Sequence, residues 1–137
     1  MTSTHPALGI DYGEARIGVA ATDEFGILAH PVETIDCRRS DPVARIGEIA
    51  RERNVRILVV GLPLRLDGSE GDAAEKVRKF AKKLEQSLPD IPLQFVDESF
   101  TTIDAAEKLH AAGKNAKRQK SIIDQAAAVE ILRVWMG

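Results

Sequence analysis

The chain is organised around the stretch Ala7-Leu8-Gly9-Ile10-Asp11-Tyr12-Gly13, a short apolar run that places a carboxylate just before a Tyr-Gly turn. The alternation of its residues predicts a strand with the large side chains, Leu8 and Ile10, on one face. The opposite face carries Asp11 among small residues, which leave room for a ligand beside the carboxylate. The alternative interpretation is that Asp11 only opens a hairpin turn, because Asp and Gly are common turn residues.

The length and composition predict one globular domain over residues 1–137, with residues 1–6 expected to be flexible. Hydrophobic residues make up 44% of the chain and charged residues 29%, which is ordinary for a soluble domain. No apolar stretch approaches the ~20 residues of a membrane span. The first six residues lack the basic start and apolar core of a signal peptide. We therefore expect a cytoplasmic protein with no membrane contact.

The charged and metal-binding residue types exclude several classes of site. With 19 Lys and Arg against 21 Asp and Glu, the net charge is −2, so nucleic-acid binding would have to rest on a local basic patch. Cys37 is the single cysteine, which excludes an internal disulfide and predicts a free thiol. The three histidines show no metal-ligand spacing.

The rest of the chain passes from a strand meander to alternating helices and strands. Pro31 interrupts the third strand and favours an edge position for it. Asp41 and Pro42 are typical of a helix start. After the first strand, we expect strands at 16–22 and 28–35, followed by a helix from Pro42 to near Asn54. The next expected elements are a strand at 56–61, a helix at 72–88, a strand at 93–97 and a helix at 101–112. The last expected helix runs from Ser121 through Trp135.

This order predicts an α/β fold: a mixed five-stranded sheet of order 3-2-1-4-5 with helices on both faces. Right-handed crossovers place the fourth strand beside the first and the fifth strand outside it. Asp11 then lies at the centre of the sheet, next to the change in strand direction, where open α/β sheets bind ligands. Glu98 follows the fifth strand and opens on the same edge.

The last helix supplies a third acid to this edge. At about 100° per residue, Asp124 points nearly the same way as Ile131, on the apolar face. Gln125, by contrast, is expected on the solvent face. Two small neighbours, Ala127 and Ala128, would let the helix approach the sheet closely. The alternative is that Asp124 is a first-turn residue capped by Ser121, favourable to the helix dipole.

Three carboxylates converging in one crevice indicate a divalent-cation site. Without a cation, Asp11, Glu98 and Asp124 would repel one another and raise each other's pKa values. Mg²⁺ or Mn²⁺ would relieve this repulsion while keeping water and phosphate oxygens as further ligands. Two such ions can hold the attacking and leaving oxygens of a phosphoryl transfer. The acids are therefore predicted as both metal ligands and catalytic residues of phosphodiester hydrolysis.

Four motifs together resemble the YqgF family. They are Gly9-Ile10-Asp11-Tyr12-Gly13 with Arg16 and Gly18, Gly61-Leu62-Pro63 with Asp67-Gly68-Ser69, Asp97-Glu98-Ser99-Phe100-Thr101-Thr102, and Asp124-Gln125-Ala126-Ala127. The resemblance spans nearly the whole chain. It implies an RNase H-like fold related to Holliday-junction resolvases, and it puts Asp11, Glu98 and Asp124 in the family's acidic positions. Ser99 stands where the family commonly has Arg.

The resemblance also implies an activity. Members of the family are described as nucleases that mature the 5′ end of the small-subunit (16S) ribosomal RNA precursor, and some are assigned to junction resolution. We therefore expect a metal-dependent nuclease acting on precursor rRNA, in association with ribosomal particles. Branched DNA is the alternative substrate, and the sequence does not choose between monomer and homodimer.

Two further classes of function stay open at this stage. The Gly-Ile-Asp-Tyr-Gly run also resembles the first phosphate motif of actin-like ATPases, although these enclose ATP with a second similar domain. A non-catalytic RNA-binding factor of ribosome assembly could retain the three acids as well.

A basic segment precedes the last helix. Lys114, Lys117, Arg118 and Lys120 are predicted to lie in a connection at the rim of the acidic crevice and to bind phosphates of nucleic acid. Arg16 of the first motif is predicted as a further nucleic-acid contact. The alternative is that these charges only solvate a loop, with the substrate held by the lysine-rich helix at 72–88.

Overall fold

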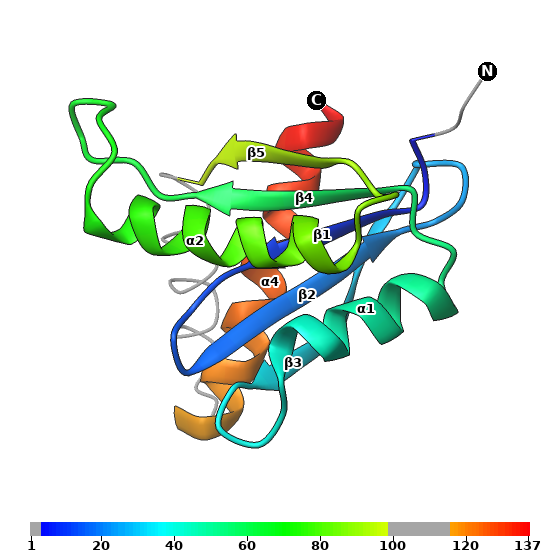
Figure 1. Ribbon diagram of the computed structural model, residues 1–137, viewed down its shortest axis with the longest axis horizontal. Coiled ribbons are helices and arrows are strands. Elements are labelled where there is room, and N and C mark those ends of the chain that lie inside the picture. Colours follow the sequence, from blue (N-terminus) through cyan, green and yellow to red (C-terminus); the bar gives the residue numbers. More distant parts are fainter. Residues whose placement is uncertain (1–3, 99–115) are drawn as a thin grey trace.

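The structure, a computed structural model, describes residues 4–98 and 116–137, with the backbone alone over 116–120 (Figure 1). The helix predicted at 101–112 and residues 1–3 of the expected flexible start lie outside the described residues. Within the described part, no helix is both long and apolar enough to span a membrane. The elements are β1 (Ala7–Asp11), β2 (Arg16–Thr22), β3 (Ala29–Asp36), α1 (Pro42–Glu52), β4 (Ile57–Leu62), α2 (Asp72–Ser87), β5 (Leu93–Asp97) and α4 (Ala116–Met136).

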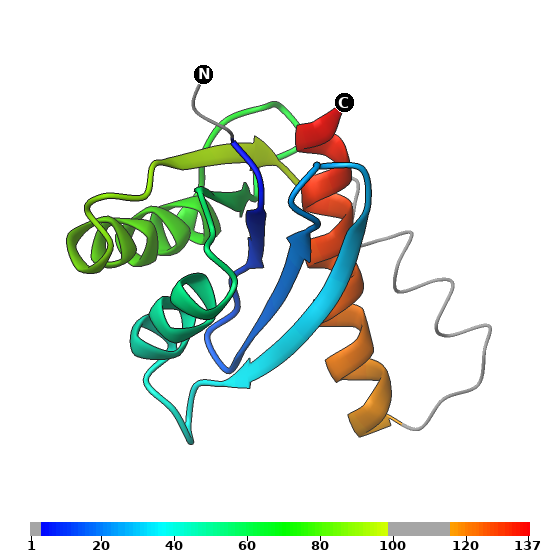
Figure 2. The same cartoon turned by 90° about the vertical axis from the view of Figure 1, so that its right-hand side faces the viewer.

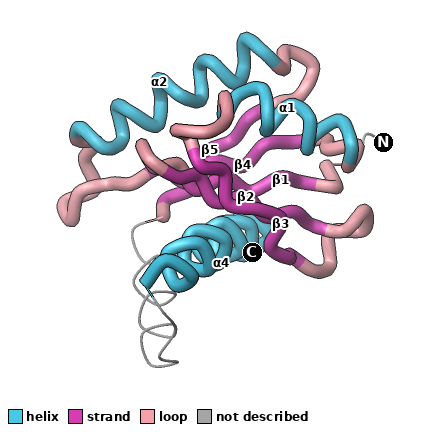
Figure 3. Tube along the Cα trace, turned by 90° about the horizontal axis from the view of Figure 1, so that it is seen from below, coloured by secondary structure: helices cyan, strands magenta, loops and turns pink. Residues whose placement is uncertain are grey.

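The strands form one sheet of order β3-β2-β1-β4-β5, as predicted. β1 pairs antiparallel with β2 and parallel with β4, so the strand direction changes beside β1. Figures 2 and 3 show α1 and α2 on one face of the sheet and α4 on the other. The predicted mixed sheet with helices on both faces is therefore confirmed.

The two faces of β1 differ as the alternation predicts. Leu8 and Ile10 are fully buried in the apolar core under α1 and α2. Ala7 belongs to the second core, under α4. On this second face a Cβ on Gly9 would lie 2.6 Å from Leu132 Cγ, so only a glycine fits beneath the helix. The small residues of β1 thus set how closely α4 packs on the sheet.

β4 shows the pattern of a strand covered on both faces. All six of its residues are buried, and it pairs in parallel with both β1 and β5. Its β-branched run supplies Leu58 and Val60 to one core and Ile57 and Val59 to the other. A continuous apolar strand is what such a position requires.

The edge position of β3 and the start of α1 also agree with the sequence pattern. β3 lies at the sheet edge, where Pro31 costs no interior ladder hydrogen bond. Its register with β2 slips between Pro31 and Glu33, which leaves Val32 as a bulge. Asp41 caps α1 by accepting a hydrogen bond from Val43 N at 3.1 Å.

The start of α4 differs from the prediction. The helix begins at Ala116, not at Ser121, so positions 117, 118 and 120 lie in a helix and not in a connection. The segment 116–120 consists of good helix formers and contains no Gly or Pro that would stop it. The Ser121 hydroxyl donates to Thr34 Oγ1 at 3.1 Å on β3, so it does not act as the cap that its residue type favours.

We predict that Gly18→Ala strongly destabilises the fold. A Cβ at Gly18, on β2, would lie 1.9 Å from the backbone oxygen of Asp124, so α4 would have to move. The free energy of unfolding in urea should fall by about 2 kcal/mol or more. Gly47→Ala is the matched control: its Cβ would meet nothing closer than 3.5 Å within α1, and it should gain about 0.5–1 kcal/mol. Equal stability of Gly18→Ala and the wild type would contradict the close approach of α4.

Candidate active site

Two of the predicted acids meet at the carboxyl edge of the sheet. Asp11 is the last residue of β1, and Glu98 follows β5 directly. Both strands run parallel to β4, which lies between them, so their ends reach the same edge. The backbone N–H of Glu98 donates to Leu62 O at 3.3 Å, which fixes Glu98 against the end of β4.

Glycines clear the space around these acids. Gly18 is the cross-strand partner of Asp11, and its missing side chain lets the backbone of Asp124 come over β2. A Cβ on Gly61 would lie 2.7 Å from Glu98 Oε2 and 2.5 Å from Ile131 Cδ1. The Glu98 carboxylate and α4 therefore pack directly on backbone, and the acids approach one another because no Cβ intervenes.

The carboxyl groups of Asp11 and Glu98 are hydrogen bonded to each other. Burial, and then the neighbouring Glu98, raise the pKa of Asp11 far above its usual range, with a smaller contribution from Asp124. Burial also raises the pKa of Glu98, which is 8% exposed, although the hydrogen bond from Asp11 opposes that rise. Both shifts favour a proton held between the two carboxyl groups over two charged carboxylates.

Asp124 lies nearby but is held by Arg16. Arg16 Nε donates to Asp124 Oδ2 at 2.9 Å, and the Asp124 side chain is only 16% exposed. Burial raises the pKa of Asp124, and Arg16 opposes the rise. The predicted inward orientation is thus confirmed. Because α4 begins at Ala116, Asp124 is no first-turn cap, and that alternative interpretation is excluded.

Gln125 corrects the predicted solvent face of α4. Its Nε2 donates to Thr34 Oγ1 on β3 at 3.0 Å, so it faces the sheet and not the solvent. The helix contacts β1, β2 and β3 together, and this broad contact covers more of its circumference than one apolar stripe.

The donor set fits a magnesium-like cation in part. Asp11 and Glu98 bring hard carboxylate oxygens together, and Mg²⁺ is commonly held by one or two protein carboxylates. Within residues 4–98 and 116–137, no three His, Cys, Asp or Glu side chains come close enough to hold a metal ion together. The structure therefore brings together two of the three predicted ligands, while Arg16 holds the third.

The structure places the residues predicted to contact nucleic acid in different surroundings. Arg16 is a charge partner of Asp124, a role the sequence analysis missed. The signal was available, because Arg16 and Gly18 share the face of β2 that Asp11 occupies on β1. Positions 117, 118 and 120 lie on the first turns of α4, leading toward Asp124. Lys114 and Ser99 lie outside the described residues.

The fold is that of the RuvC-like resolvases. The structure is similar to that of Thermus thermophilus RuvC, with a TM-score of 0.57, 16% identity, and coverage of 96% of this chain and 95% of RuvC. That structure is described as RuvC in complex with Holliday junction substrate. A second RuvC structure gives a TM-score of 0.53. The predicted RNase H-like fold is confirmed.

The chain belongs to the RuvX (YqgF) family, whose model, described as "RuvX: Holliday junction resolvase", matches residues 5–137. Three relatives carry the name "Putative pre-16S rRNA nuclease". The protein from Cutibacterium acnes is 49% identical over 91% of this chain and 78% of its own length. Those from Streptomyces coelicolor and a Synechococcus species are 47% and 42% identical, covering 92% and 96% of this chain and 76% and 89% of their own lengths. The family assignment favours the nuclease interpretation over an ATPase.

The shared proton gives a stability prediction for the metal-free protein. The pKa of Asp11 is raised above its unfolded value near 4, so the folded state binds more protons above about pH 4, and the free energy of unfolding falls as the pH rises. Asp11→Asn should stabilise the protein in EDTA at pH 8 by on the order of 1 kcal/mol and flatten this decline. Urea unfolding at pH 5 and pH 8 measures both effects. The control is Glu85→Gln on the exposed face of α2, and a less stable Asp11→Asn protein would contradict the account.

Proposed function

We propose that this chain is a divalent-metal-dependent nuclease that hydrolyses phosphodiester bonds. The observation that carries the proposal is the contact of half-buried Asp11 with buried Glu98 at the carboxyl edge of the sheet, beside the change in strand direction. Burying two acids in contact costs stability unless a proton or a cation compensates. A bound divalent cation would supply this compensation.

Mg²⁺ or Mn²⁺ would be held by Asp11 and Glu98, while Asp124, the third predicted ligand, pairs with Arg16. When bound, such an ion supplies positive charge that activates an attacking water and stabilises the leaving oxygen of the phosphate. Arg16 donates to Asp124 at 2.9 Å, which fixes the carboxyl group and opposes the rise in its pKa that burial causes. The glycines of β2 and β4 let α4 and the Glu98 carboxylate pack directly on the backbone of the sheet beside Asp11.

The substrate we propose is the 5′ end of the small-subunit ribosomal RNA precursor. The names of the relatives, at 42–49% identity, support this choice. The cytoplasm and ribosomal particles are where this substrate would be met. Branched DNA is the second candidate, favoured by the description of the family. The same pair of acids would serve either backbone, so the substrates must be compared directly.

We predict that Asp11→Asn and Glu98→Gln each abolish cleavage while leaving the protein folded. The wild type should cleave precursor rRNA in Mg²⁺ or Mn²⁺ and be inactive in EDTA. Each variant should lose on the order of a thousandfold or more, the equivalent of several kcal/mol of transition-state stabilisation. The measurement is a side-by-side assay on precursor rRNA and a four-way DNA junction.

Glu85→Gln is the matched control for that assay, because it makes the same carboxylate-to-amide change at an exposed position remote from the edge. Cleavage of the four-way junction but not of the precursor rRNA would identify branched DNA as the substrate. RNA binding without cleavage in any metal would identify a non-catalytic assembly factor. A variant of either acid with the wild-type rate would remove that acid from the mechanism.

The basic segment before Asp124 gives a separate prediction about binding. We propose that Lys114, Lys117, Arg118 and Lys120 neutralise phosphates that flank the cleaved one. Replacing Lys114, Lys117 and Arg118 with Ala should flatten the dependence of log K on log salt by up to ~0.9 for each lost duplex phosphate, or ~0.7 for a single strand. Fluorescence anisotropy over a salt series measures this slope.

An unchanged slope would move the phosphate contacts to α2. Three cations of that helix already pair with acids: Lys76 with Glu14, Arg78 with Glu70, and Lys79 with Glu75. The exposed Lys82 and Lys83 would then be the next residues to replace.

A further inference from the structure

The segment 63–71, between β4 and α2, folds as a short hairpin. Leu64 and Glu70 pair as an isolated antiparallel bridge. Arg65 N donates to Ser69 O at 2.8 Å, within that bridge. The segment is therefore a hydrogen-bonded finger that extends beyond the end of β4 (Figure 1).

The tip of this finger has a defined turn. Gly68 N donates back to Arg65 O at 2.8 Å, and Gly68 has a φ of +85°, in the region that favours glycine. Asp67 Oδ1 accepts from both the N–H and the hydroxyl of Ser69, at 2.9 and 2.6 Å. Local hydrogen bonds hold the shape of the tip.

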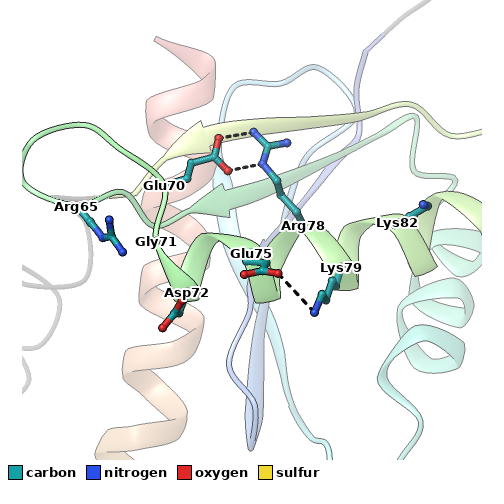
Figure 4. A pocket seen from close by; sticks show the side chains of 8 residues that line it. All are labelled: Arg65, Glu70, Gly71, Asp72, Glu75, Arg78, Lys79 and Lys82. Atoms are coloured by element: carbon teal, nitrogen blue, oxygen red, sulfur yellow. Dashed lines mark hydrogen bonds and ion pairs between the residues drawn. The ribbon is translucent and has the colours of Figure 1, made fainter.

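The base of the finger is anchored to two other elements. Glu70 receives two hydrogen bonds from the Arg78 guanidinium on α2, one of them from Nη2 at 2.9 Å (Figure 4). The same guanidinium lies over the ring of Phe95 on β5, 4.9 Å from its centroid. A bidentate ion pair stacked on an aromatic ring fixes the direction in which the finger points.

Two side chains of the tip have no role in this framework. Leu66 is fully exposed, more than any other large hydrophobic residue of the described chain. Arg65 lies against Gly71, and within the described residues its guanidinium makes no ion pair (Figure 4). A single exposed leucine is common on proteins. An exposed leucine on an anchored tip, beside a cation with no charge partner in residues 4–98 and 116–137, needs a different explanation.

The finger rises directly from the candidate active site. Its first residue follows Leu62, whose carbonyl accepts from Glu98 N at 3.3 Å, and Gly61 packs against the Glu98 carboxylate. A nucleic acid with its phosphate at Asp11 and Glu98 would therefore meet the base of the finger, from which the tip extends beyond the end of β4 (Figure 1).

We propose that the finger inserts Leu66 between two bases next to the cleaved phosphate, while Arg65 contacts the flanking backbone. This inference rests on the proposed nuclease function and adds to it the way in which the substrate is held. Apolar side chains such as Leu act as wedges of this kind when they unstack a base step, and the unstacking costs free energy. The substrate class that fits is a nucleic acid whose stack is already weakened, at the boundary between a helix and a single strand.

The test uses an RNA hairpin with a single-stranded tail and 2-aminopurine at the boundary step. Binding is measured in Mg²⁺ in the Asp11→Asn background, which prevents cleavage. The fluorescence of 2-aminopurine should rise on binding because the base is unstacked, and Leu66→Ser should remove the rise and weaken binding about tenfold. Leu66→Met, which keeps an apolar wedge, is the matched control and should retain both effects. Arg65→Gln should flatten the salt slope by ~0.7 to ~0.9 while the fluorescence rise persists.

The outcomes separate the finger from the active site. If Leu66→Ser binds with the same affinity and the same rise in fluorescence as the protein with Leu66, the proposed wedge is wrong. The nuclease function is still supported in that case if the protein with Asp11 intact cleaves the RNA. A wild-type protein that neither binds nor cleaves nucleic acid overturns the function and the wedge with it. Because the Leu66 side chain has no packing contacts to lose, an unchanged thermal melting curve of Leu66→Ser shows that any effect is on binding.

Discussion

The close packing of α4 against glycines of the sheet is the constraint on which the rest of the structure depends. Gly9, Gly18 and Gly61 lie on one face of three strands, and a Cβ at each of them would clash with α4 or with Glu98. Because these positions are bare backbone, the helix and the acid meet the sheet at distances that a side chain would prevent. The acidic edge is a consequence of this packing.

The packing determines the electrostatics of that edge. Half-buried Asp11 and buried Glu98 are brought into contact, and burial raises the pKa of both acids. Asp124 reaches the same place from α4 but is compensated by Arg16. The edge therefore contains one pair of interacting acids and one acid that has a basic charge partner.

Much of the fold could be predicted from local patterns. The alternation in β1, the apolar run of β4 and the Asp41 cap each act over a few residues, and right-handed crossovers then fix the strand order. The direction of Asp124 also followed from helical periodicity. The start of α4 was predicted too late because Ser121 is a common cap residue, although the helix formers of 116–120 extend the helix. The pairing of Arg16 with Asp124 and the contact of Gln125 with Thr34 depend on how the helix lies across the sheet. These contacts join residues 108 and 91 positions apart, so a local pattern can give the face of each residue but not its partner.

The central claim, that Asp11 and Glu98 form a cation site created by this packing, is tested most directly by Mn²⁺ binding followed by electron paramagnetic resonance. The account predicts that the wild type and Glu85→Gln bind Mn²⁺ with equal affinity, and that Asp11→Asn and Glu98→Gln each lose this binding. A wild-type protein that takes up no Mn²⁺, or an Asp11→Asn protein that binds it as tightly as the wild type, would contradict the account.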